Sequence, residues 1–512
     1  MSQYEIQIVM KNKLLLTLTF CVIIFSSFAQ NDEYKRYIEK QNQNYTDFKN
    51  KSKSDYISFQ DSINKSFASY LEKSWKEYSV FLGEEPESEP KPKSVPVAKP
   101  DDSQQGEMEV VVEKVIERAA SSPQDETNVV ADGSEVNVDV SSINNNSSFS
   151  VDFFNSKITL DVIDNFSEIR LSGTSEKDVA ALWNKFSSDA YSNMAYQMKK
   201  IAISQNINDY GLYLFISQTA QTMFPYKPNE QLVYMVFMLN QLGYKAKIAR
   251  SDDDLIALIA VKQIVYKRSY LTSENDRYYV FTAKPNEIMS CSSIFTYDNL
   301  MQNCMSNIDL SFNKPLRLRN NIKTITLSTE DFGEINVKVN LEDIDFYDNY
   351  PHTEMQVYAN AEMSDEINNS LLGPLKSQIN EMSYVDATNY LLDFIYATCN
   401  YKTDGEQFGY EKPMFCEETL YYPYSDCEDN SILFSYLVRK LLGLDVVLLD
   451  YPGHIATAVK LPEEVSGSYL HLEDGKYMVC DPTYYGASVG MSMPKYQDVK
   501  LSVIQLNKLK RY

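Results

Sequence analysis

The sequence predicts an α+β protein built from several segments. A helical pattern of apolar residues at 429–443 precedes β-forming runs in the C-terminal part, a similar pattern occurs earlier, and a strand-rich stretch lies between the two. An aromatic helical pattern and a polar linker come first. The expected segments are a signal peptide at 1–29, an aromatic 11-residue-repeat helix at 30–83, a disordered linker at 84–148, a first α+β domain at 149–310, a β-rich connecting segment at 311–370 and a second α+β domain at 371–512.

Length, charge and cysteine spacing limit the classes of protein to which the chain can belong. Its 512 residues are enough for two or three domains with buried cores. The formal net charge of −23 opposes binding to nucleic acid or anionic lipid, because a polyanion would be repelled at long range. With three histidines and no CxxC motif, the cysteines fit no metal-ligand pattern. This spacing predicts no metal site, and the covalent chemistry described below needs neither a metal nor an organic cofactor.

The first residues have the pattern of a secretory signal peptide. Lys11 and Lys13 precede an apolar run at 14–25, and small residues at 27 and 29 form a cleavage site before Gln30. This pattern predicts export to the periplasm, the cell envelope or the medium. A membrane anchor is the alternative interpretation, but the apolar run is short for a membrane span.

Aromatic residues between Tyr34 and Phe81 occur in pairs, and successive pairs are eleven residues apart. Eleven residues over three turns is about 3.67 residues per turn, so the pairs fall on one stripe of a helix. The stripe predicts a helical stalk or coiled coil that packs or self-associates. The alternative is a surface that binds a partner or an envelope polymer. Residues 84–148 are rich in Pro, Glu, Lys, Ser and Asn, a composition typical of a disordered linker. A short strand or helix at 108–118 is the alternative within this segment.

Three residues of the C-terminal part suggest covalent catalysis. Cys427 lies at the predicted start of a helix, where unpaired amides and the helix dipole favour a thiolate. His454 opens a later predicted strand and Asp481 ends another, as a base and its orienting carboxylate would require. A nearby backbone amide, such as that of Cys427, would stabilise the oxyanion. Tyr422 and Tyr424 precede the cysteine and are candidate substrate-binding residues, although aromatic packing explains them nearly as well.

Three sequence motifs surround these residues, namely SDCED at 425–429, GHIATAV at 453–459 and YMVCDPT at 477–483. In this order they resemble the transglutaminase-like superfamily, in its secreted bacterial form, over about residues 384–493. The resemblance implies a papain-like cysteine fold and either peptide hydrolysis or amide exchange, although some members only bind their ligands. It assigns the roles of nucleophile, base and orienting carboxylate, in that order, to Cys427, His454 and Asp481.

An earlier stretch, 229–243, is similar to 429–443 at an offset of 200 residues. At this offset Lys227 stands in place of the cysteine and Asp254 in place of the histidine, and no carboxylate takes the place of Asp481. We therefore interpret 149–310 as a degenerate transglutaminase-like copy that serves as a scaffold or holds substrate. Chance similarity between two helix-strand-strand units is the alternative.

These observations favour an exported transglutaminase-like cysteine enzyme that cleaves or exchanges peptide or isopeptide bonds in a peptide or protein substrate. The alternative is a non-catalytic peptide-binding or envelope scaffold protein, consistent with the predicted stalk, linker and degenerate copy. The N-terminal helix offers a surface for self-association or envelope contact. The sequence leaves open whether water or an amine resolves the acyl-enzyme, and whether Cys427 forms a disulfide with Cys416.

Overall fold

The computed structural model describes residues 40–48, 51, 55, 58–86, 91–99, 106–118, 147–162, 166, 169–187, 189–312, 314–329 and 332–512. The chain divides into two compact units, Met1–Ser66 and Phe67–Tyr512. The predicted signal peptide lies outside the described residues. No helix in the described part of the chain combines the length and apolar character needed to cross a membrane.

The first unit contains part of the predicted aromatic helix. Residues 40–48 and 58–66 are helical, and Tyr45, Phe48 and Phe59 are exposed there. The prediction of one helix over 30–83 is wrong at its end. Lys76–Ser79 form strand β1, because β10 (Ser293–Thr296) offers an edge with which this segment pairs.

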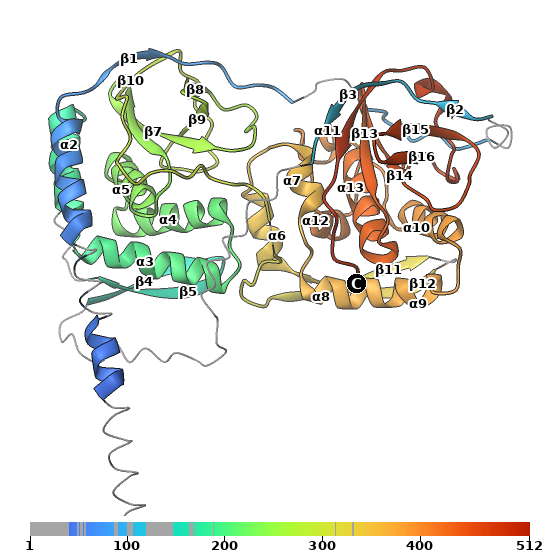
Figure 1. The fold of residues 1–512 in the computed structure, drawn as a ribbon, viewed down its shortest axis with the longest axis horizontal. Coiled ribbons are helices and arrows are strands. Elements are labelled where there is room, and N and C mark those ends of the chain that lie inside the picture. The colour runs from blue at the N-terminus through green and yellow to red at the C-terminus, as the bar shows by residue number, and fades with distance from the viewer. Residues whose placement is uncertain are drawn as a thin grey trace, which may run out of the picture. The chain divides into compact units, whose positions relative to one another are not determined.

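The second unit contains two structural repeats, which we define as residues 147–310 and 322–512 (Figure 1). The first repeat begins with a β-hairpin, continues through four helices and ends in strands. Besides β10, its elements are β4 (Ser147–Phe153), β5 (Ser156–Val162), α2 (Glu176–Phe186), α3 (Asp189–Ser204), α4 (Asp209–Met223), α5 (Pro228–Gln241), β6 (Ala246–Ser251), β7 (Asp254–Val261), β8 (Tyr270–Ser273) and β9 (Asp276–Phe281).

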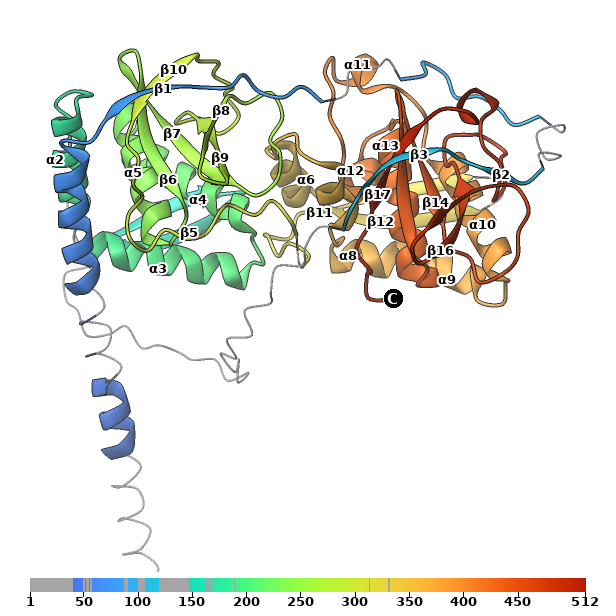
Figure 2. The same ribbon diagram turned by 45° about the horizontal axis from the view of Figure 1, so that its top comes forward.

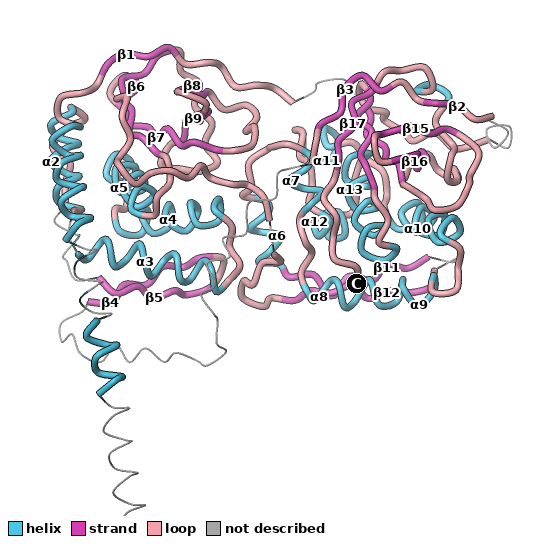
Figure 3. Tube along the Cα trace, in the orientation of Figure 1, coloured by secondary structure: helices cyan, strands magenta, loops and turns pink. Residues whose placement is uncertain are grey.

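The second repeat has the same plan with shorter and more numerous helices. It too begins with a β-hairpin, and Figure 3 shows both hairpins in magenta. Its elements are β11 (Ile322–Thr329), β12 (Gly333–Asn340), α6 (Leu341–Asp348), α7 (Met355–Asn360), α8 (Asp365–Ile367), a π-helical turn (Asn368–Leu372), α9 (Gly373–Ile379), α10 (Tyr384–Thr398), α11 (Asp404–Gln407), α12 (Cys416–Tyr421), α13 (Cys427–Leu437), a second π-helical turn (Val438–Leu442), β13 (Val446–Tyr451), β14 (His454–Val459), β15 (Ser468–Leu472), β16 (Gly475–Cys480), a 3-10 turn (Pro494–Tyr496) and β17 (Leu501–Gln505).

The main sheets of the two repeats share strand order and register. The order β10-β6-β7-β9-β8 in the first repeat corresponds to β17-β13-β14-β16-β15 in the second. Ser251 pairs with Asp254, and Tyr451 pairs with His454 at an offset of 200 residues. In each repeat one helix, α5 or α13, packs on the sheet with nearly all its residues buried. The similarity between 229–243 and 429–443 therefore extends to a complete sheet topology.

This arrangement corrects the prediction of a separate β-rich connecting segment at 311–370. The segment 311–370 is not β-rich throughout: the side chain of Asn340 accepts a hydrogen bond from the amide of Glu342 and starts helix α6, and further helices follow. The hairpin of β11 and β12 packs against α8 and α10 of the second repeat. It therefore belongs to that repeat and is not a separate connection.

The disordered linker predicted for 84–148 is also wrong in part. Strand β2 (Met108–Glu109) pairs with β15, and β3 (Val112–Ile116) pairs with β17, so both edges of the second sheet are covered (Figure 2). Edge strands expose unpaired backbone groups, which explains why a segment rich in valine adds to them. Residues 91–99 also pack on the second repeat, as described below.

Candidate active site

Cys427 is the first residue of the buried helix α13. Asp426 and Asp429 close a capping box around it: the Asp426 side chain accepts from the amide of Asp429, and the amide of Asp426 donates to the Asp429 carboxylate at 3.1 Å. This box explains the spacing of the two aspartates in the SDCED motif. It leaves Cys427 in the first turn, where the positive end of the helix dipole favours an anion.

His454 and Asp481 are brought to the same place by the strand pairing. The chain turns at Pro452 and Gly453, where the glycine has a φ of 71°, and His454 then begins β14. Asp481 follows β16, which pairs with β14. The Nε2 atom of His454 lies 2.8 Å from Oδ2 of Asp481. The three residues predicted as a triad therefore come from a helix start, a strand start and a strand end of one domain.

Asp481 is held in turn by its own hydrogen bonds. Its second carboxylate oxygen accepts from the amide of Thr483 at 3.0 Å and from the hydroxyl of Thr483 at 2.9 Å. The His454 ring stacks on Tyr496, with ring centroids 5.0 Å apart and planes within 8°. The hydrogen bond to Asp481 and the stacking on Tyr496 together fix the position and orientation of the imidazole ring.

The imidazole of His454 is electrostatically prepared to hold a proton. Burial alone would lower its pKa, but Asp481 and then Cys427 act in the opposite direction, and the pKa is raised well above the ordinary 6.5. The Nδ1 atom is buried and has no hydrogen-bond partner among the described residues. Because Asp481 takes Nε2, Nδ1 is the nitrogen that remains for the thiol.

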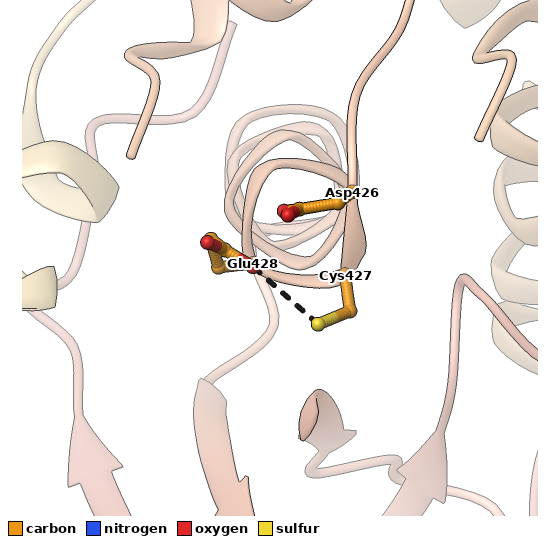
Figure 4. A group of neighbouring side chains, drawn as sticks. All are labelled: Asp426, Cys427 and Glu428. Carbon is orange, nitrogen blue, oxygen red and sulfur yellow. Dashed lines mark hydrogen bonds between the residues drawn. The ribbon is translucent and has the colours of Figure 1, made fainter. Parts of the chain in front are cut away.

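A cluster of carboxylates lies beside the thiol. The Sγ atom of Cys427 donates to Oε2 of Glu428 at 3.4 Å, and Figure 4 shows Asp426, Cys427 and Glu428 around the first turn of α13. The ammonium of Lys91 forms ion pairs with Asp426, at 3.0 Å, and with Glu428 and Glu411. The cysteine is completely buried, with 0% of its surface exposed.

The thiol and the imidazole open into one cavity of about 350 Å³. Its lining also includes three charged residues and two aromatic ones, namely Lys91, Glu411, Glu428, Tyr266 and His352. None of these residues was predicted from the sequence as part of a site. Glu428 lies inside the SDCED motif and was within reach of sequence reasoning, but Lys91 belongs to a proline-rich stretch that indicated only a linker.

The two tyrosines predicted to bind substrate lie elsewhere. Tyr422 donates from its hydroxyl to the Asp348 carboxylate at 2.8 Å, and Tyr424 is 40% exposed with the ammonium of Lys402 over its ring. Neither is among the described residues that line the cavity. Helix α12 ends at Tyr421, and the segment from there to Cys427 turns these side chains toward other partners, so their role in substrate binding stays a prediction.

The remaining cysteines do not cap the site. Cys416 and Cys427 both carry free thiols, as do the other described cysteines, so the disulfide that the sequence left open is not formed. Burial raises the pKa of Cys416 to about 12. A buried thiol of this kind is a packing residue and not a second nucleophile.

The corresponding positions of the first repeat carry no such chemistry. Lys227 precedes α5 without a side-chain cap, and Asp254 begins β7 in an exposed position. The pairing of β7 with β9 places Thr282 where the second repeat has Asp481. Comparison of the chain with protein-family models, curated proteins and solved structures finds no match.

Proposed function

We propose that the protein is an exported transglutaminase-like cysteine enzyme that cleaves or exchanges amide bonds of a peptide or protein substrate. The observation that carries the proposal is the fixed His454, whose Nε2 is bound to Asp481 while its buried Nδ1 is unpartnered in the cavity of Cys427. A nucleophile at a helix start, a base and an orienting carboxylate are the groups that acyl transfer needs.

The geometry supports a two-step reaction. Nδ1 of His454 takes the thiol proton, and the thiolate attacks the amide carbonyl carbon. The C–N bond then breaks, and the imidazolium returns the proton to the leaving amine, which leaves a thioester on Cys427. Water or a second amine cleaves the thioester, giving hydrolysis or amide exchange. The amide of Cys427 is the candidate donor to the oxyanion.

Alkylation of the thiol tests this proposal most directly. We expect iodoacetamide to label purified protein on Cys427 at neutral pH, and His454→Ala to slow labelling or move it to higher pH, because the thiol loses its base. Cys427→Ala controls for labelling at other thiols. Slow labelling with the same pH profile in wild type and His454→Ala would contradict an activated pair.

A non-catalytic peptide-binding scaffold is the second candidate. It is favoured by the 0% exposure of Cys427, because a substrate reaches a fully buried thiol only if the side chains around it move. In this case the cavity would bind a ligand without forming a covalent adduct. Release of a peptide fragment or incorporation of a labelled amine, lost in Cys427→Ala, would decide for the enzyme.

A further inference from the structure

Residues 91–99 form a strap that lies on the second repeat beside the cavity. The hydroxyl of Tyr401 donates to the carbonyl of Pro92 at 2.8 Å. Farther along, the amide of Ala98 donates to the carbonyl of Tyr485 at 2.8 Å, and the amide of Tyr485 donates to the carbonyl of Pro96 at 3.2 Å. A strap fixed by a few backbone hydrogen bonds, with no regular element of its own in these residues, is a segment that can be displaced.

The strap inserts one side chain into the acidic side of the cavity. Lys91 is 15% exposed along its side chain and forms ion pairs with Glu411, Asp426 and Glu428. The neighbouring Lys93, by contrast, is exposed. The burial of a long cationic side chain against carboxylates beside the thiol is the arrangement expected of a ligand in a binding site.

The buried carboxylates near Cys427 outnumber the positive charges that lie against them. Asp404, Asp426 and Asp429 offer oxygen atoms that all lie within 4.8 Å of one another. Burial, and then the other two carboxylates, raises the pKa of Asp404, while Lys91 lowers it. Lys91 forms an ion pair with Asp426 of this cluster, and its other two ion pairs are with the nearby Glu411 and Glu428. Such a pocket needs a cation to be stable while ionised.

A second observation points to a ligand. The Oδ1 atom of Asp426 is buried, with 0% of the residue's surface exposed, and it has no hydrogen-bond partner among the residues that the structure describes. A buried carboxylate oxygen without a donor is uncommon in a folded protein. Lys91 therefore occupies the pocket without satisfying all of its acceptors.

We propose that the acidic pocket of Asp404, Glu411, Asp426 and Glu428 is a subsite for the primary ammonium of a substrate lysine side chain, and that Lys91 occupies it in cis. The inference rests on the proposed function, because it makes the pocket part of the substrate site next to Cys427. The strap then acts as a competitor, which must leave before a substrate with a lysine side chain enters.

The test compares full-length wild type with Lys91→Ala, and with Lys93→Ala as a matched control on the same strap. The Lys91 side chain is tethered to the same chain, so it occupies the pocket at an effective concentration in the millimolar range. Its removal is expected to raise the rate at which iodoacetamide alkylates Cys427 by about tenfold. Lys93→Ala is expected to label at the wild-type rate. If Lys91→Ala fails to fold, Lys91→Met keeps the aliphatic stem and removes the charge.

Binding of a defined probe is measured separately from reactivity. N-acetyl-lysine methylamide is titrated into Lys91→Ala by calorimetry, and N-acetyl-norleucine methylamide, which lacks the ammonium, serves as the control. We expect the lysine probe to bind and to slow alkylation, the norleucine probe to do neither, and Glu411→Gln in the Lys91→Ala background to weaken lysine binding.

The two readouts separate the subsite from the catalytic proposal. Lysine binding to an unreactive Cys427 would retain the subsite and remove the enzyme. Rapid alkylation without lysine binding, or equal binding of both probes, would retain the enzyme and overturn the subsite. Unchanged alkylation in Lys91→Ala would overturn the competition by the strap.

Discussion

The two repeats have the same sheet but differ at the start of the helix that packs on it. In the second repeat Cys427 follows the N-cap of a capping box and lines the same cavity as His454. In the first repeat Lys227 precedes a proline at the start of α5, and its side chain makes no cap. The strand order and the register at the β6–β7 and β13–β14 turns are nonetheless equal. Fold and site are therefore specified by different residues.

The two repeats also differ in the polar residues at the start of α5 and of α13. The helix start of the second repeat contains buried carboxylates, which are costly without compensation. The first repeat has Pro228 and Asn229 there, and Asn229 accepts a hydrogen bond from the amide of Leu255 through its side chain. Polar groups in the first repeat thus serve the packing of helix on sheet, whereas in the second they surround a thiol.

The largest expected difference between the repeats is in thiol reactivity. We expect iodoacetamide adducts on Cys427, with Cys304 of the first repeat at least about 10³-fold slower, because the reactive species is the thiolate. Burial raises the pKa of Cys304 to about 12. Peptide mapping by mass spectrometry after timed labelling measures both rates. Comparable labelling of the two thiols in folded protein would mean that the second repeat does not activate its cysteine.

The next difference concerns histidine protonation. The chain has three histidines, so their ring protons can be followed individually by NMR. His454 is expected to stay protonated well above pH 6.5, and Asp481→Asn to lower its pKa, because the carboxylate favours the charged ring. Burial lowers the pKa of His352 to about 4, so this residue serves as an internal reference that Asp481→Asn leaves unchanged. A His454 that titrates near 6.5 in both proteins would remove the basis for an activated base.

The elements of this fold differ in how far the sequence predicts them. The helix at Cys427, the turn before His454 and the strand before Asp481 are all predicted locally, because apolar periodicity and turn residues mark them. The strand order is not local, and the repeat was detected only because residues 229–243 retain the pattern of 429–443.

The parts that sequence reasoning missed depend on contacts between distant residues. Lys91 lies 335 residues before Asp426 along the chain, and nothing in the composition of a proline-rich stretch indicates such a partner. Strands β2 and β3 lie at 108–116, where the sequence allowed a short strand or helix, but their pairing with β15 and β17 depends on edges far along the chain. Tyr422 was named as a candidate substrate-binding residue because it lies close to Cys427 along the chain, but the direction of its side chain is set by the backbone between them.

The acidic helix start also predicts a dependence of stability on pH. Asp404 has a folded pKa raised above the ordinary 3.8, so the folded state binds its proton more tightly than the unfolded chain does. Its contribution to stability is therefore present at low pH and is lost as pH rises from about 4 through the raised folded value. We expect Asp404→Asn to reduce the loss of stability between about pH 5 and pH 8.

Urea unfolding at several pH values measures this dependence. The exposed Asp254, at the matching end of the first repeat sheet, provides the control variant Asp254→Asn. This control is expected to keep the wild-type dependence on pH. An equal reduction in both variants would show that the effect comes from net charge and not from the buried cluster.

The smallest expected effect comes from giving the first repeat the cap of the second. Lys227→Asp places a carboxylate before Pro228 and three residues ahead of Glu230, the spacing of a capping box. N-terminal capping and the helix dipole both favour this change, which is expected to stabilise the protein by about 0.5–1 kcal/mol. Lys227→Ala, which adds no acceptor, is the control and is expected to have little effect, because Lys227 makes no cap.

Thermal unfolding of both variants measures the change. Stabilisation by the aspartate alone would show that the capping box is a structural device independent of the cysteine. Destabilisation would show instead that Lys227 has a packing role that the helix start of the second repeat does not need.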